Sequence, residues 1–347
     1  GERIGMQPMM DGPGARTERV RVRAFARGAL REETDALDAA HLLSVDRDAG
    51  FAWIDLVEPR RETVDWLAGH YRLHPLAEAE VFEAHRESAV KIFEGAAHVI
   101  ALFPRRHDLP IRTGEVQLIV GEGFLISIHQ ADFQDVERVL EQWASVPDEW
   151  RQTSSSLVYA ILAQAMRPFV PLADAAEDAL SLLEEETIHP AAKRLPKRET
   201  LHRLFDLTEQ ISDLHDLAAP LRSVLESLSQ NDAWLTGGHG HAYLADVYDD
   251  AARLAERLEM LRDAAERLFN MVNSLITLQR TDVSNQLTVV ATIFLPLSFI
   301  TGYFGQNFAY MTGSVASRWD FLIWGGLLQV ATLAVILVTL KRLGAFD

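Results

Sequence analysis

The sequence predicts an α/β cytoplasmic domain followed by long helices, the last two of which cross a membrane. Three observations support this prediction. Strand-like apolar runs stop near Pro147, long helical patterns follow, and charged residues are missing from 283 to 317 and again from 321 to 340. A transmembrane helix needs about 20 mostly apolar residues, so each uncharged stretch is long enough to contain one.

The composition excludes several functions. Asp and Glu total 50 against 33 Lys and Arg, a net charge of −17, whereas proteins that bind nucleic acids normally carry a basic surface. The 347 residues include no Cys, which excludes disulfides, thiolate zinc sites and Cys nucleophiles. The sequence also lacks P-loop, zinc-protease, serine-hydrolase and EF-hand signatures. We therefore predict neither an enzyme nor a nucleic-acid partner.

The α/β domain is predicted over residues 17–147, after a Gly/Met/Pro-rich segment (1–16) that we expect to be a disordered tail or a cloning remnant. Its strands are predicted at 19–27, 51–56, 89–95, 97–104, 115–123 and 124–130, with helices at 62–71, 76–85 and 132–144. Glycines 95, 121 and 123 fall where hairpin turns are expected.

A helical hairpin region is predicted over 148–242. Its first helix runs from Ser154 to Ile188 and is broken near Pro168 and Pro171; its second starts at about Arg198. The Gly-rich loop 234–241 contains His239 and His241, which could bind a metal, although two such histidines are more typical of a solvated loop.

The next segment, 243–304, is predicted to be one stalk helix that continues into the first membrane span at about 286–304. Small or apolar residues alternate steps of four and three along it, at Val247, Ala251, Leu254, Leu258, Leu261, Ala265, Leu268, Val272 and Leu275. Four heptads of this kind are typical of a coiled coil or bundle, so we expect an oligomer.

The second membrane span is predicted at 320–340, after a loop at 305–319 and before a tail at 341–347. Arg280 precedes the first span and Lys341 and Arg342 follow the second, while the loop carries only Arg318. Because basic flanks favour the cytoplasmic side, we expect a multi-pass protein of the inner membrane with both termini in the cytoplasm.

The first span carries a stripe of small and hydroxyl-bearing residues, Thr288, Ala291, Leu295, Ser298 and Gly302. Several copies around an axis could line a water-filled path with this stripe, or the stripe could serve close helix packing; spacing alone favours neither. Pro296 is expected to bend the helix, and Gly305-Gln306-Asn307 to end it in a flexible turn with an uncharged amide.

The run from Ala291 to Met311, with the short loop and final helix after it, resembles the CorA family of divalent-cation transporters for magnesium and cobalt. WIDLVEP (53–59), LHPLAEAEV (73–81) and YLADVYDD (243–250) are similar to further segments of that family, so the resemblance covers about residues 50–342. It implies a homopentamer in the lipid bilayer, with a cytoplasmic α/β funnel, a pore formed by the stalk helices and an outer ring of second spans.

The resemblance also implies site residues. Asn307 matches the Asn of the family's Gly-Met-Asn selectivity motif, whose amide oxygens could accept hydrogen bonds from the water shell of Mg²⁺. Further pore-lining positions match Thr281, Ser284, Leu287, Leu295 and Ser298, of which the two leucines would be hydrophobic constrictions. Glu80 and Asp246 match acidic positions that bind a regulatory Mg²⁺ between neighbouring subunits, so that loss of internal Mg²⁺ opens the pore.

The chain departs from the family pattern where ion preference is decided. Gln306 stands where the family has Met, Thr312-Gly313 replaces Pro-Glu, and no acid lies between 283 and 317. The zinc-transporting branch of the superfamily also replaces the Met, so a Zn²⁺ transporter, coupled to protons or not, is the alternative to a Mg²⁺ or Co²⁺ channel. A membrane-anchored coiled-coil sensor that moves no ions explains the heptads and spans but not the polar stripe.

Overall fold

The computed structural model of the protein describes residues 18–35, 37, 50–105, 111–130, 136–188, 198–230, 240–306 and 317–342. The chain divides into two compact units. Unit 1 consists of 1–189 and 198–267, and unit 2 of 190–197 and 268–347. The predicted tail at 1–16 lies outside the described residues.

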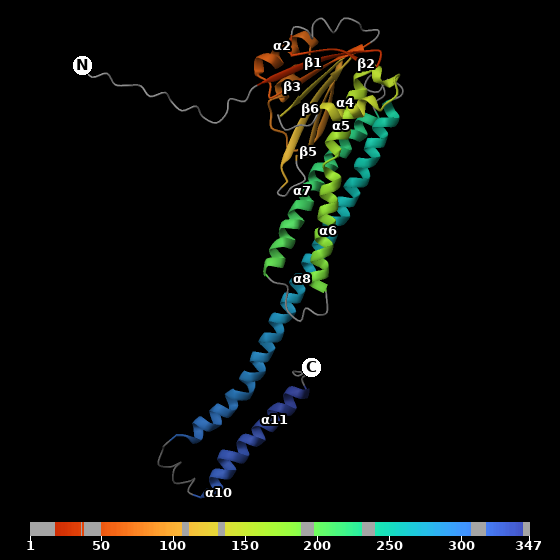
Figure 1. Ribbon diagram of the computed structural model, residues 1–347. Coiled ribbons are helices and arrows are strands. Elements are labelled where there is room, and N and C mark those ends of the chain that lie inside the picture. Colours follow the sequence, from red (N-terminus) through yellow and green to blue (C-terminus); the bar gives the residue numbers. More distant parts are fainter. Residues whose placement is uncertain are drawn as a thin grey trace, which may run out of the picture. The chain divides into compact units, whose positions relative to one another are not determined.

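Unit 1 contains a seven-stranded mixed sheet with the order β2-β1-β3-β7-β6-β5-β4 (Figure 1). The central pair β3 and β7 is parallel and every other pair is antiparallel. The strands are β1 (Arg19–Ala26), β2 (Ala29–Thr34), β3 (Gly50–Val57), β4 (Ala89–Phe93), β5 (Ala96–Pro104), β6 (Thr113–Gly121) and β7 (Phe124–His129).

All six predicted strands are confirmed, within a few residues at their ends, and one strand was missed. The missed strand, β2, lies at the edge of the sheet with five of its six residues exposed. An exposed edge strand needs no apolar alternation, so its sequence ALREET carries no strand signal. Its hairpin with β1 turns at Arg27 and Gly28, both at positive φ, as two-residue hairpin loops require.

The predicted hairpin glycines have different roles. Gly95 and Gly123 lie in turns at φ values of 81° and 78°, in the left-handed region that favours glycine, as predicted. Gly121 instead ends β6, where the ring of Phe124 occupies the space that a Cβ would need. Close packing therefore explains glycine at this position.

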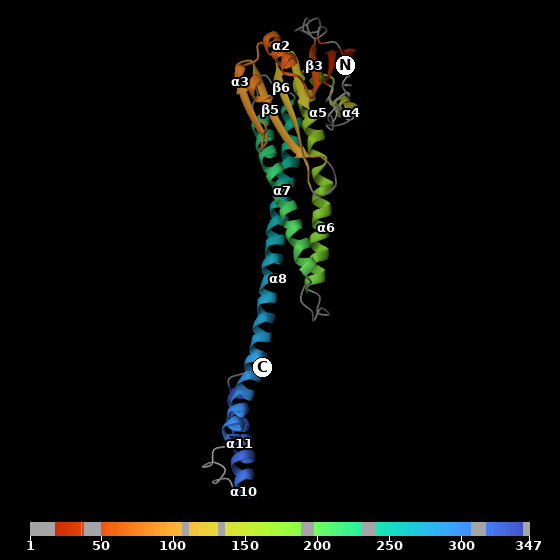
Figure 2. The same cartoon turned by 90° about the vertical axis from the view of Figure 1, so that its left-hand side faces the viewer.

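Helices cover both faces of the sheet. On one face α2 (Arg61–Tyr71) buries Val64 and Leu67 against Val22, Ile54 and Ile126 of the strands. On the other face, α5 (Ser154–Met166) packs against β3, β5, β6 and β7, and α7 (Arg198–Ser229) against β4 and β5 (Figures 1 and 2). Almost every residue of α5 is buried, which explains why this apolar helix could be mistaken for a membrane span.

The helix predicted at 76–85 is shorter than expected. The observed helix α3 spans Pro75–Glu80, with Pro75 at its first position and the His74 ring accepting a hydrogen bond from the Leu76 amide. Beyond Glu80 the chain forms long-range contacts: the Val81 carbonyl accepts from Gln117, and His85 pairs with Glu115. Tertiary contacts thus outweigh the helical propensity of this segment.

The helices after the sheet begin and end close to the predicted positions, with one exception at Pro171. The predicted helix at 132–144 is described from Val136 to Ala144 as α4, and a 3₁₀ turn, η1, follows at Trp150–Gln152. The break near Pro168 separates α5 from α6 (Phe169–Ile188), whereas Pro171 lies in the first turn of α6 and causes no break. Pro is tolerated there because first-turn amides have no intrahelical partner.

Helix α8 runs unbroken from Gly240 to Phe304 and contains Pro296. The Trp150 indole lies where a Cβ of residue 240 would be, and the Trp150 ring stacks on Tyr243 at 4.7 Å. Eight of the nine heptad positions, from Val247 to Val272, are buried within this single chain, and only Leu275 is exposed. The heptads alone are therefore no evidence for an oligomer.

Unit 2 contains the two helices that were predicted to cross a membrane. The end of α8 is followed, after residues that are not described, by α10 (Arg318–Asp320), a π-helical segment η2 (Phe321–Leu327) and α11 (Leu328–Arg342). Among the described residues, three helical stretches are long and apolar enough to span a bilayer, namely Ser154–Thr187, Gly240–Phe304 and Leu322–Arg342. Only the first is largely buried in the protein; the most apolar windows of the other two are wholly unburied.

A buried ion pair lies in the sheet between β3 and β7. His129 Nε2 lies 3.1 Å from Asp55 Oδ1, which also accepts a hydrogen bond of 2.6 Å from Ser127. Burial would raise the pKa of Asp55, but the hydrogen bonds and the charge of His129 lower it below its ordinary value. Burial acts the other way on His129, yet the Asp55 carboxylate raises its pKa above 6.5.

We expect Asp55→Asn to lower the free energy of unfolding by about 3 kcal/mol, because it removes the carboxylate whose charge compensates that of the buried His129 imidazolium. The contribution of His129 is full below pH 6.5 and is lost as the pH rises through its raised folded-state pKa. That of Asp55 is lost as the pH falls through its lowered folded-state pKa. Urea unfolding of the full chain in detergent, followed by tryptophan fluorescence across this range, measures both. Equal losses in Asp55→Asn and in the exposed control Asp65→Asn would contradict this expectation.

Candidate functional site

The predicted pore stripe lies along one continuous helix, α8. All of its predicted members are exposed, and none is covered by the part of the chain that the structure describes. Leu287 and Leu295 are each 70% exposed, which is unusual for leucines that do not face lipid or another protein copy. The residues concerned are Thr281, Ser284, Leu287, Thr288, Ala291, Leu295, Ser298 and Gly302.

The threonine hydroxyls of the stripe act as acceptors toward their surroundings. Thr281 Oγ1 donates to the Thr277 carbonyl at 3.0 Å, and Thr288 Oγ1 donates to the Ser284 carbonyl at 2.8 Å. Because a hydroxyl has one proton and two lone pairs, the oxygen keeps its acceptor capacity after the proton is used. Such a surface suits water molecules that are themselves bound to a cation.

The helix ends at the predicted motif. Phe304 is the last residue of α8, and the Gly305 amide donates to the Thr301 carbonyl at 3.0 Å. The Gln306 amide donates to the Tyr303 carbonyl at 3.3 Å, so the last turn tightens from i−4 to i−3 bonding. Gly305 and Gln306 are exposed, and Asn307 lies outside the described residues.

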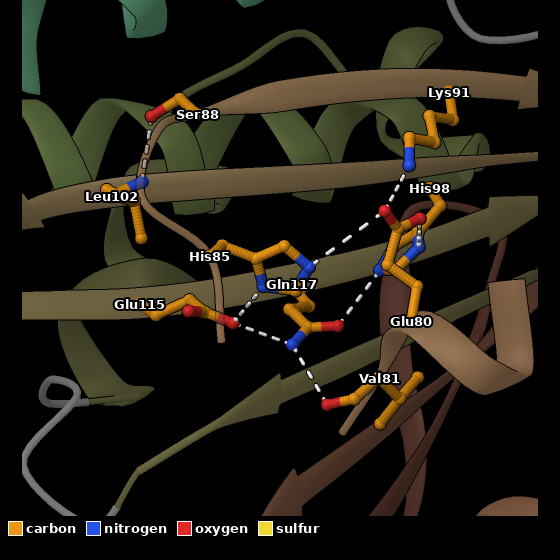
Figure 3. Close-up of polar contacts among 9 residues, drawn as sticks. All are labelled: Glu80, Val81, His85, Ser88, Lys91, His98, Leu102, Glu115 and Gln117. Atoms are coloured by element: carbon orange, nitrogen blue, oxygen red, sulfur yellow. Dashed lines mark hydrogen bonds and ion pairs between the residues drawn. The ribbon is translucent and has the colours of Figure 1, made fainter. Parts of the chain in front are cut away.

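A second polar site surrounds Glu80 in unit 1, at the end of α3 (Figure 3). The Glu80 carboxylate forms an ion pair with Lys91 of β4, and its Oε2 lies 3.5 Å from Nδ1 of the buried His98 on β5. His85 Nε2 lies 4.0 Å from Glu80 Oε1. Burial would raise the pKa of Glu80, but Lys91 and the two histidines lower it below its ordinary value. The carboxylate is therefore charged at neutral pH.

Gln117 of β6 organises this Glu80 site. Its Nε2 donates to the Val81 carbonyl at 3.1 Å and to Glu115 at 2.6 Å, and its Oε1 lies 3.0 Å from His98 Nε2. Because the amide oxygen can only accept, His98 carries its proton on Nε2. Burial lowers the pKa of His98 below its ordinary value, although the hydrogen bond to Gln117 and the charge of Glu80 act in the other direction.

The sequence interpretation selected Glu80 but none of its partners. A signal was present for two of the surrounding residues: His98 in the run AAHVIALFP and Gln117 in the run EVQLIVG each stand among apolar residues, where a buried polar side chain needs a partner. No comparable signal marks His85 or Lys91, because their roles depend on how β4 and the segment before it lie in the fold. Strand pairing cannot be read from the local sequence.

A model of the family described as CorA-like Mg²⁺ transporter protein matches residues 48–342 of the chain. The chain belongs to the CorA-like Mg²⁺ transporter family. Among the relatives is the cobalt/magnesium transport protein CorA of Thermotoga maritima, which is 27% identical over 294 residues; these cover 82% of this chain and 80% of that protein.

Two solved structures have a similar fold. The full-length CmaX protein has a TM-score of 0.73 at 19% identity, covering 96% of this chain and 99% of its own. The CorA magnesium transporter from Methanocaldococcus jannaschii has a TM-score of 0.70 at 19% identity, covering 92% and 97%. The family model confirms the predicted family, and the two structures confirm the predicted fold of a single chain, whereas the pentamer stays a prediction. The family is one of membrane transporters, not of enzymes.

The resemblance to the CorA family paired Glu80 with Asp246. In the structure the two side chains differ in exposure to solvent. Glu80 is 8% exposed and already bound by Lys91, whereas Asp246 is exposed on α8. Among the described residues, no three side chains of His, Asp or Glu are arranged to hold a metal ion. The regulatory Mg²⁺ site between subunits stays a prediction. His241 is exposed in the first turn of α8, and His239 is not described.

We expect Gln117→Leu to lower the free energy of unfolding by about 2 kcal/mol, because it leaves the His98 N–H and the Val81 carbonyl buried without a partner. Urea unfolding monitored by circular dichroism measures the loss. Gln152→Leu, at an exposed position of η1, is the control and should change little. A Gln117→Leu protein as stable as the wild type would show that the Glu80 site is not organised by this amide.

Proposed function

We propose that the protein is a homopentameric channel that moves divalent cations, Mg²⁺ first and Co²⁺ second, across the inner membrane. The observation that carries the proposal is the exposed stripe of α8, whose acceptor oxygens and small residues lead to Gly305-Gln306-Asn307. Five copies around an axis would enclose this stripe and cover its exposed leucines. Membership of a transporter family and the name of the Thermotoga maritima relative support the same reading.

The membrane potential is the proposed driving force. Moving one elementary charge through 100 mV contributes about 2.3 kcal/mol, hence about 4.6 kcal/mol for a divalent ion. With both termini in the cytoplasm, the Gly305-Gln306-Asn307 motif would lie at the outer mouth, where it meets the hydrated ion first. Uptake then needs no proton gradient and no ATP.

Zn²⁺ transport, with or without proton coupling, is the alternative, because the zinc-transporting branch of the superfamily also lacks Met at the position of Gln306. A polar amide replaces the thioether of the typical family motif at this position. Dependence of flux on a pH gradient separates the two mechanisms, since a channel driven by potential ignores the gradient. A sensor that moves no ions would give no flux for any metal.

Regulation by internal Mg²⁺ is proposed at Glu80 and Asp246. A cation that bridges the two carboxylates from neighbouring subunits would hold the closed state together. In the described chain Lys91 binds the Glu80 carboxylate, so the ion must compete with a cation that the protein itself supplies. We propose that this competition sets the Mg²⁺ concentration at which the channel closes.

We expect Asn307→Ala to reduce Mg²⁺ flux more than about tenfold while the pentamer persists. The variant loses hydrogen bonds to the hydrated cation, and a hydrogen bond to a charged group is worth about 1.5 kcal/mol or more. Flux into proteoliposomes with a trapped metal-sensitive dye measures it, with Mg²⁺, Co²⁺ and Zn²⁺ in turn, with and without a pH gradient. Asn270→Ala, exposed elsewhere on α8, is the control. Unchanged flux in Asn307→Ala would refute the role of the motif.

We expect Glu80→Gln and Asp246→Asn to keep the channel open at internal Mg²⁺ concentrations that close the wild type. Lys91→Met should act in the opposite direction and close the channel at lower Mg²⁺, because the competing ammonium is gone. Flux at stepped internal Mg²⁺ measures all three, with Asp249→Asn as the neighbouring control. Closure of Glu80→Gln at the wild-type concentration would exclude Glu80 as a ligand.

A further inference from the structure

One amide in the second span bonds to the first span. Thr332 and Thr339 of α11 satisfy their hydroxyls within their own helix, by donating to the Leu328 and Val335 carbonyls at 2.8 Å. Gln329 instead donates from Nε2 to Thr301 Oγ1 of α8 at 3.0 Å. Because hydrocarbon offers no other partner for an amide, this bond ties the two helices together at a fixed register.

Thr301 links this amide to the motif at the end of α8. Its hydroxyl donates to the Leu297 carbonyl at 2.8 Å and accepts from Gln329, which uses the one proton and one lone pair. Its carbonyl accepts from the Gly305 amide at 3.0 Å. Gln329 of the second span is therefore joined to Gly305 through one residue, Thr301, by one hydrogen bond to its side chain and one to its carbonyl.

The π-helical segment η2 brings a second residue to the same place. The Trp324 ring stacks on Phe304, the last residue of α8, with ring centroids 6.5 Å apart. Trp324 and Gln329 are five residues apart, whereas residues that share a face of an α-helix are three or four apart. A π-helix bonds residue i to residue i+5 and therefore contains more residues per turn than an α-helix. The π-helical segment thus allows two side chains five residues apart to lie on one face, and both contact the last turn of α8.

We propose that Gln329, aided by the π-helical placement of Trp324, is a positioning residue that fixes the last turn of α8 and hence the orientation of Gly305 and Gln306 at the pore mouth. This inference rests on the proposed function of that motif. Gln329 itself touches no ion: it acts through Thr301. The consequence is that loss of the bond alters the ratio of rates for different cations more than it alters assembly.

The first experiment tests the contact without transport. The chain has no Cys, so Thr301→Cys/Gln329→Cys can be oxidised in membranes and the linked peptides identified by mass spectrometry. We expect a link within one chain. Thr301→Cys/Val330→Cys is the matched control, because Val330 is 65% exposed and one residue further round the helix. Equal linking in the two pairs, or none in the first, overturns the proposal.

The second experiment tests the role. Gln329→Leu and Thr301→Val should each change the ratio of Mg²⁺ to Co²⁺ flux by about threefold, which corresponds to the average strength of interhelical hydrogen bonds in a membrane protein. The double variant should be no worse than either single one, since both remove the same bond. Thr332→Val, whose hydroxyl stays within α11, is the control and should leave the ratio unchanged.

The outcomes separate this inference from the proposed function. A wild type that transports cations, with the flux ratio unaltered in Gln329→Leu, overturns the inference alone. Additive effects of Gln329→Leu and Thr301→Val overturn it as well. A wild type that moves no divalent cation overturns the proposed function, and this role with it, even where the cross-link forms.

Discussion

Polar groups inside a bilayer have no water to bond, and the C-terminal part of this chain follows from that constraint. Threonines on both spans return their protons to carbonyls of their own helix, as Thr288 does to Ser284 and Thr339 to Val335. The oxygens of these hydroxyls then present lone pairs to their surroundings. For the same reason the Gln329 amide donates its hydrogen bond to Thr301, and this bond also sets the register of the two helices.

In unit 1 the corresponding constraint concerns charged side chains that are buried in the protein. Asp55 with His129, and Glu80 with Lys91, are pairs in which removal of one partner leaves an uncompensated charge. The two pairs differ in access. His129 is buried and its pair is a fixed part of the sheet, whereas the Lys91 side chain is 52% exposed and can leave Glu80 for solvent. Only the second pair can therefore exchange its internal cation for an external one.

The sequence predicted elements whose signal is local and periodic. Strands β3 and β5 to β7 are apolar runs bounded by turn residues, and the seam of α8 repeats over four heptads, so each was found. β2 was missed because an exposed edge strand needs no pattern, and η2 because FLIWGGL reads as any apolar helix. Of the residues around Glu80, Lys91, His98 and Gln117 come from three strands and His85 from the segment before β4, and only the folded sheet brings them together.

The donor atoms available along the membrane part argue for Mg²⁺ over Zn²⁺. Between residues 283 and 340 the sequence contains no His, Cys, Asp or Glu apart from Asp320. The proposed pore therefore offers only hydroxyl, amide and carbonyl oxygens. Zn²⁺ prefers imidazole and thiolate, whereas Mg²⁺ is held by oxygen and keeps its waters. Neutral oxygens bind a hydrated ion weakly, and weak binding lets the ion leave as readily as it enters. Replacement of Met by Gln306 adds one more oxygen to this set, which strengthens the preference for a hard, hydrated cation.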